Sequence, residues 1–146
     1  MIFTGQKLVV QGTPIGENSG LSLTLQKNFT YEKEEPGKDI LFYQKDGHYF
    51  TRIEVLGSKI DLKEEKINAK SYLATTGKVE TGVAANNSSF YKAAILHLHA
   101  FNEIDYTTIV IKPVKGQYVK FTIHHPNKKE NDNGVKTMLE ILSSVK

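Results

Sequence analysis

The stretch FYKAAILHLHAFNEIDYTTIVIKPVKGQYVKFTIHH, residues 90–125, contains the main fold signal of this 146-residue chain. Three runs rich in β-branched, aliphatic and aromatic residues are separated in it by the short segments NEID and KPVKGQ. Runs of this composition favour strands, and connections of this length are typical of hairpins. The stretch therefore predicts three consecutive antiparallel strands.

Further strands are predicted on the N-terminal side. The segment LSLTL, residues 21–25, alternates apolar and polar side chains, which is typical of a half-buried strand. EEPGKD supplies a turn, and residues 40–57 then form two strand-like runs around Asp46 and Gly47, a strong hairpin signal. Residues 1–20 are rich in turn formers and predict a loose or edge-strand lead-in.

Two segments change to helical spacing. In residues 58–77, Asp61 and Glu64 match a capping box and Gly77 suits a C-terminal stop. The apolar stripe of this helix would consist of Leu62, Ala69, Tyr72 and Leu73. Residues 131–146 predict a second helix that docks on the sheet through Val135, Met138, Leu139, Leu142 and Val145.

Together these elements predict an α+β fold. An antiparallel β-sheet of about six strands would pack with two main helices, one mid-chain and one C-terminal. A length of 146 residues with 39% hydrophobic content fits one domain, residues 1–146, whose core needs no disulfide or metal.

The charged residues argue against nucleic-acid binding. Arg52 is the only arginine among 19 basic residues, and the net charge is +3. Interfaces that read nucleic acids favour arginine and gather positive charge into a patch. Neither feature is present in this sequence.

Other function classes lack their signatures. The chain has no cysteine, which excludes disulfides, thiolate metal sites and a cysteine nucleophile. It has no run of ~18 apolar residues that would span a membrane, and its N-terminus does not have the regions of a signal peptide. No nucleophile elbow or Gly-rich phosphate loop occurs, so the chain is expected not to be an enzyme, with a small hydrolase as a remote alternative.

The order of segments resembles known families. The run LSLTLQKNFTYEKEEPGKDILFYQKDGHYFTRIEVLG is followed by a helix with NAKSYL, then by YVKFTIHHP and MLEILSSVK. This layout, over about residues 21–146, resembles the PsbP-like fold and the small lipoproteins and secreted domains of Gram-positive bacteria. The resemblance implies a PsbP-like α+β domain that acts as a binding or assembly subunit. It transfers no catalytic residue.

Two histidines on one strand raise the possibility of a metal site. His97 and His99 lie two residues apart, so they share a face of their strand, and His124 lies on a later strand. If the three imidazoles converge, they could hold zinc or another divalent metal. Two observations oppose this hypothesis. Residues 106–114 would separate the two strands by roughly 10 Å, and no acid in these strands offers a partner for a ring N–H. The other interpretation is that the histidines are ordinary residues on a partly exposed or helix-covered face.

Arg52 and Glu54 form the second candidate, a possible binding face. They share one face of their strand, and a lone arginine suggests a place that needs a planar, bidentate donor. A cross-strand ion pair accounts for Arg52 equally well and is the favoured interpretation.

The sequence thus favours a non-catalytic, extracytoplasmic cell-envelope domain. We expect the mature part of a bacterial lipoprotein or secreted protein, without a cofactor, that binds a protein or surface ligand through its sheet face or loops. Its link to the membrane would be an N-terminal lipid anchor that this sequence does not contain. The alternatives are a cytoplasmic location and a metal-binding domain or metalloenzyme that uses His97, His99 and His124.

Overall fold

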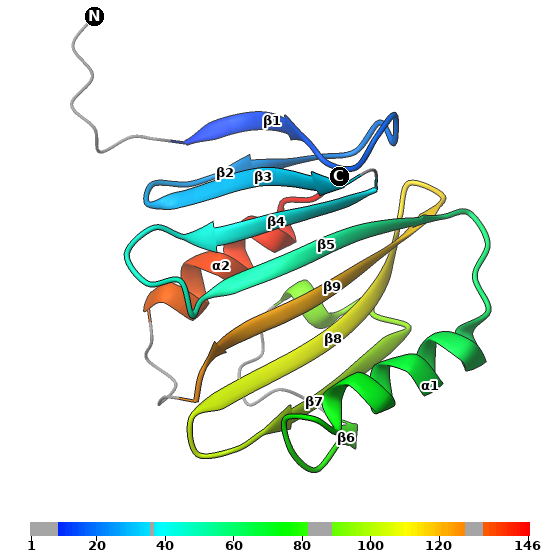
Figure 1. The fold of residues 1–146 in the computed structure, drawn as a ribbon. Coiled ribbons are helices and arrows are strands. Elements are labelled where there is room, and N and C mark those ends of the chain that lie inside the picture. The colour runs from blue at the N-terminus through cyan, green and yellow to red at the C-terminus, as the bar shows by residue number, and fades with distance from the viewer. Residues whose placement is uncertain (1–8, 36, 82–88, 128–132) are drawn as a thin grey trace, which may run out of the picture.

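A computed structural model describes residues 9–35, 37–81, 89–127 and 133–146. Its main feature is a seven-stranded antiparallel sheet in the order β3-β4-β5-β9-β8-β7-β6. The strands are β3 (Phe29–Glu35), β4 (Lys38–Tyr43), β5 (Phe50–Gly57), β6 (Glu80–Thr81), β7 (Leu96–Phe101), β8 (Asp105–Val114) and β9 (Gln117–Pro126). Figure 1 shows this sheet with one helix on each side.

The predicted α+β class is confirmed, and the strand count is larger than expected. The stretch at residues 90–125 does form three consecutive antiparallel strands, β7, β8 and β9. A separate two-stranded sheet pairs β1 (Val10–Pro14) with β2 (Ser22–Leu25), so the described lead-in forms an edge strand. A two-residue strand, β6, adds to the far edge. It carries no alternating apolar pattern, because both of its residues are exposed.

The mid-chain helix α1 (Leu62–Leu73) begins where the capping signal predicts. The side chain of Asp61 accepts a hydrogen bond from the backbone N–H of Glu64 at 3.1 Å. Ala69 and Leu73 are buried against the apolar side chains of β7 and β8. The predicted stripe is wrong in its other half, because Leu62 and Tyr72 are 41% and 44% exposed. Ala69 and Leu73 lie four residues apart, so they share one face of the helix. This short helix contacts the sheet along the narrow line that they form.

The C-terminal helix α2 (Asn133–Ser143) covers the opposite side of the sheet. Met138, Leu139 and Leu142 are buried as predicted, and they pack with Phe121 and with Phe90 of the short helix η1 (Ser89–Tyr91). The chain end holds β2 as well. Lys146 and Ser22 exchange two backbone hydrogen bonds, each 2.9 Å long.

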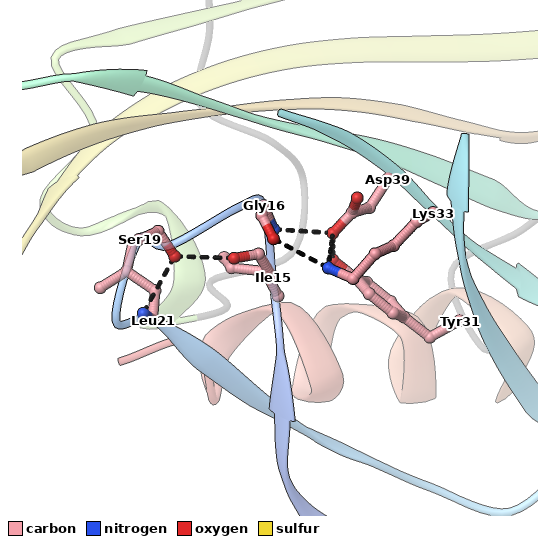
Figure 2. A network of polar contacts seen from close by, with 7 residues as sticks. All are labelled: Ile15, Gly16, Ser19, Leu21, Tyr31, Lys33 and Asp39. Atoms are coloured by element: carbon pink, nitrogen blue, oxygen red, sulfur yellow. Dashed lines mark hydrogen bonds and ion pairs between the residues drawn. The ribbon is translucent and has the colours of Figure 1, made fainter. Parts of the chain in front are cut away.

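A buried polar network joins the β1–β2 hairpin to the main sheet (Figure 2). The Oδ2 atom of Asp39, on β4, accepts a hydrogen bond from the backbone N–H of Gly16 at 2.8 Å and another from the hydroxyl of Tyr31. The ammonium group of Lys33 lies 3.6 Å from the same oxygen and donates to the carbonyl of Gly16 at 2.8 Å. Asp39 is 1% exposed, so the partners of Oδ2 supply part of the stabilisation that water would give a carboxylate at the surface, while Oδ1 is buried without a hydrogen-bond partner.

Gly16 and Gly77 are the glycines that close approach requires. Gly16 has φ of +63°, and a Cβ atom there would lie 2.9 Å from Cγ2 of Val55. A Cβ atom on Gly77 would lie 2.3 Å from the carbonyl oxygen of Phe101, which is closer than side-chain carbons approach backbone. Gly77, expected as a helix stop, therefore lets the segment after α1 lie against the end of β7.

Candidate functional site

The sheet leaves part of its α1 side uncovered. In Figure 1, α1 lies over β7 and β8, while β3, β4 and β5 have no helix in front of them. Three cross-strand rows on β4, β5 and β9 define this surface, which we call the open face. The rows are Phe42, Phe50 and His124; Ile40, Arg52 and Thr122; and Lys38, Glu54 and Lys120.

The open face combines apolar and charged groups. Ile40, Phe42 and Phe50 are partly exposed there, although antiparallel sheets usually present polar side chains on a solvated side. The guanidinium of Arg52 lies 5.5 Å from the ring centre of Phe50, a cation–π contact. Exposed apolar and aromatic side chains beside an arginine are typical of protein-binding surfaces.

Arg52 and Glu54 share the open face, as the alternation of their strand predicts. The Nε atom of Arg52 donates to Oε1 of Glu34 at 3.0 Å. Glu34 lies on β3, so this ion pair reaches over β4, and the predicted cross-strand pair is confirmed. Both side chains remain substantially exposed, at 48% and 37%. Pairs this exposed contribute little to stability, which leaves the guanidinium able to contact a partner.

A groove lies between α1 and the open face. One cavity of about 370 Å³ is lined in part by Arg52, Asn68, Tyr72, Lys120 and Thr122. A second, of about 310 Å³, continues from Tyr72 to the strand ends at Asp105 and His124. Since Tyr72 lines both, we call the two cavities together the α1 groove. Lys120 pairs with Glu65 of α1 at 3.6 Å across it.

His124 has a fixed place in the α1 groove. Its ring stacks on Phe50 with centres 4.4 Å apart. Its Nε2 atom shares a hydrogen bond with the Tyr72 hydroxyl at 3.1 Å, and Nδ1 shares one with the Thr107 hydroxyl at 3.2 Å. Because hydroxyls donate and accept, both nitrogens are satisfied in either neutral tautomer. Burial, and then the charge of Arg52, lower the pKa of His124 to about 4, so the ring is neutral at pH 7.

The three predicted metal ligands do not converge. His97 lies opposite Val110, which lies opposite Phe121, so His97 and His99 point to the α2 side of the sheet. His124 follows Phe121 by three residues and therefore points to the α1 side. Strand β8 also separates β7 from β9, as the sequence suggested. In the part of the chain that the structure describes, no group of three or more acidic or histidine side chains is arranged as a metal site.

His97 and His99 instead belong to a row of stacked rings. His97 is parallel to Tyr91 at 4.3 Å, and His99 is nearly parallel to Tyr106 at 5.5 Å. Tyr106 in turn stacks on His125 at 5.0 Å. Burial, and then the neighbouring His99, lower the pKa of His97. His97 is partly exposed, and His99 is 8% exposed.

His99 has an acidic partner that comes from outside the histidine-bearing strands. Glu80 of β6 pairs with His99 in register, and its Oε1 atom lies 3.2 Å from the Nε2 atom of His99. The prediction considered only acids on the histidine-bearing strands. Glu80 belongs to a two-residue strand in a polar segment, where no periodic pattern identifies it.

Comparison with known proteins gives the family and the fold. A family model described as "Domain of unknown function (DUF8580)" matches residues 6–146. No curated protein matches the sequence. Among solved structures, cyanobacterial PsbP (CyanoP) from Synechocystis sp. PCC 6803 is similar, with a TM-score of 0.60 and 10% identity over 100% of this chain and 96% of that one.

The Ran-binding protein Mog1p of Saccharomyces cerevisiae is also similar, with a TM-score of 0.54 and 10% identity. The match covers 96% of this chain and 95% of Mog1p. The predicted resemblance to the PsbP-like fold is confirmed. At these identities the likeness establishes the fold alone.

Proposed function

This chain belongs to the family of domains of unknown function DUF8580, and from that premise we propose that it is a non-catalytic domain that binds a protein partner through the open face and the α1 groove. The observation that carries the proposal is the set of partly exposed apolar residues, Ile40, Phe42 and Phe50, in register on adjacent strands beside Arg52. This arrangement offers a partner exposed apolar side chains and a planar cation beside them.

Several features suit a protein partner. The strands of the open face are held in register by their neighbours on both sides, so the surface is preformed and loses little entropy on binding. Arg52 and Tyr72 are residue types that carry much of the energy at protein interfaces. The similar Mog1p is described as a Ran-binding protein, so the fold occurs in a protein with a protein partner.

The groove is less suited to catalysis. His124 has both ring nitrogens in hydrogen bonds to hydroxyls, and its pKa of about 4 makes it a weak base at pH 7. Lys120 and Arg52 are each engaged with a glutamate. These observations support a binding role for the groove residues.

We further propose that the domain works outside the cytoplasm, as the mature part of a Gram-positive envelope lipoprotein or secreted protein. The support is the layout of residues 21–146, which resembles such proteins. The test is the native gene. A signal peptide with a lipobox cysteine ahead of Met1, together with incorporation of labelled palmitate, is the expected result. A gene that begins at this methionine and a product found in the cytosolic fraction would refute this location.

The partner surface can be tested by site-specific photo-crosslinking in the native host. A photoreactive amino acid replaces Ile40 on the open face or, as the matched control, Lys136 on the exposed side of α2. We expect a discrete adduct from position 40, its loss in the additional variant Arg52→Glu, and none from position 136. Equal adducts from both positions, or an adduct unaffected by Arg52→Glu, would contradict the proposal.

A further inference from the structure

The pair His97 and His99 has the spacing of a chelate on one strand. Side chains two residues apart on a strand point to the same face, and their rings here have centres 6.5 Å apart. Each imidazole stacks on a tyrosine ring: His97 on Tyr91 and His99 on Tyr106. Such stacking fixes the ring planes and reduces the entropy lost when a ligand binds both.

One nitrogen of each ring is buried without a hydrogen-bond partner. Over the described residues, Nε2 of His97 and Nδ1 of His99 are two of only four such side-chain atoms. A buried polar atom without a hydrogen-bond partner costs free energy. The two unpartnered nitrogens therefore lower the stability of the folded protein. A ligand that accepts two lone pairs at once would remove both deficits.

The other nitrogen of His99 already has the partner that metal-bound histidines usually have. Glu80 lies 3.2 Å from Nε2 of His99. A proton on Nε2 is donated to this carboxylate, which fixes the tautomer with a lone pair on Nδ1, the atom without a partner. A carboxylate in this position orients a ligating imidazole and makes it more basic.

From this juxtaposition we propose that His97 and His99 chelate one first-row divalent transition-metal ion through Nε2 and Nδ1, with Glu80 as the positioning residue. Imidazole ligands suit zinc, copper and nickel. His124 takes no part, because it lies on the opposite face of the sheet. The inference is independent of the proposed open-face function.

Binding requires a small adjustment of the rings. Metal–nitrogen distances of about 2.0–2.1 Å at a tetrahedral ion place two imidazole centres roughly 5 Å apart. The observed 6.5 Å is wider, so the rings must close by about 1 Å through side-chain rotation.

The test is metal binding by the full chain without a histidine tag. Zn²⁺ is titrated by calorimetry, and Cu²⁺ is followed by electron paramagnetic resonance, whose hyperfine pattern counts bound nitrogens. We expect each chain to bind one metal ion and the copper spectrum to show two nitrogen ligands. Stoichiometric binding is lost in His97→Phe and in His99→Phe, which keep an aromatic ring in the stack. His48→Ala, which removes an exposed histidine elsewhere, is the matched control and leaves binding unchanged.

Glu80→Gln separates a positioning role from a purely structural one. An amide keeps the shape of the side chain but accepts the N–H less strongly, so we expect metal affinity to fall 10–100-fold with an unchanged melting temperature of the metal-free protein. No stoichiometric binding by the wild-type chain, or binding that persists in both phenylalanine variants, would overturn the proposal. So would a copper spectrum with no nitrogen ligands.

Discussion

The backbone N–H of Gly16 donates to the carboxylate of Asp39 at 2.8 Å, across 23 positions of sequence. This bond ties the turn of the two-stranded sheet to the second strand of the seven-stranded sheet (Figure 2). Asp39 also accepts from Tyr31, and burial followed by this hydrogen bond raises the pKa of Tyr31. The contact links two sheets that share no strand pairing.

Asp39→Ala should therefore destabilise the protein strongly. The change leaves the Gly16 N–H and the Tyr31 hydroxyl without their acceptor, at a cost of about 2–3 kcal/mol in the free energy of unfolding. Urea denaturation measures this value. The control is Lys33→Met: the Lys33 side chain is 50% exposed, so this change should cost less than about 1 kcal/mol. Equal losses from the two variants would contradict the central role of Asp39.

Gly77→Ala should also be destabilising, for a steric reason. The new methyl group would lie 2.3 Å from the Phe101 carbonyl oxygen, and backbone cannot rotate away as a side chain can. We expect a loss of about 1–3 kcal/mol. Gly47→Ala is the matched control, because nothing lies within 4 Å of a Cβ atom there. A thermal melt of both variants is sufficient, and an unchanged melting temperature for Gly77→Ala would disprove the contact.

The stability of the fold should fall as the pH falls below about 6.5. The pKa of His124 is about 4 in the folded state and near 6.5 when the chain is unfolded, so between these values the unfolded state binds more protons. Unfolding is then favoured on acidification. After allowance for solvent screening we expect a loss of about 1 kcal/mol between pH 7 and pH 5.

His124→Gln isolates this contribution. Urea titrations at several pH values should show a smaller slope of stability against pH for the variant than for the wild type. A residual slope is expected from His97, whose pKa is also lowered. A slope equal to that of the wild type would show that His124 does not titrate as described.

The Arg52–Glu34 pair should add little to stability. Its partners are 48% and 37% exposed, and exposed pairs contribute about 0.2–1 kcal/mol. A double-mutant cycle of Arg52→Ala and Glu34→Ala, followed by urea denaturation, gives the coupling energy. A coupling above about 2 kcal/mol would mean that Arg52 is a structural residue. In that case a substitution of Arg52 would change the stability of the protein as well as its binding to a partner.

How the faces of these elements meet depends on long-range packing. The alternation in residues 96–101 correctly places His97 and His99 on the face opposite to Leu98. It does not predict whether His124 lies on the same face of the sheet as these two histidines. That depends on the pairing of β8 with both neighbours, because a shift of one residue would reverse every side chain. The groove at Tyr72 and the acidic partner Glu80 depend on the same long-range packing.

The local elements follow from the sequence alone. The strand-forming composition and short connections of residues 90–125 predicted β7, β8 and β9, and the Asp61 cap predicted the start of α1, because both signals arise from neighbours along the chain. The two-residue strand at Glu80, the burial of Asp39 beneath Gly16 and the exposure of Tyr72 have no such local signal. Their energies come from contacts between segments far apart in sequence, which form only once the sheet has assembled.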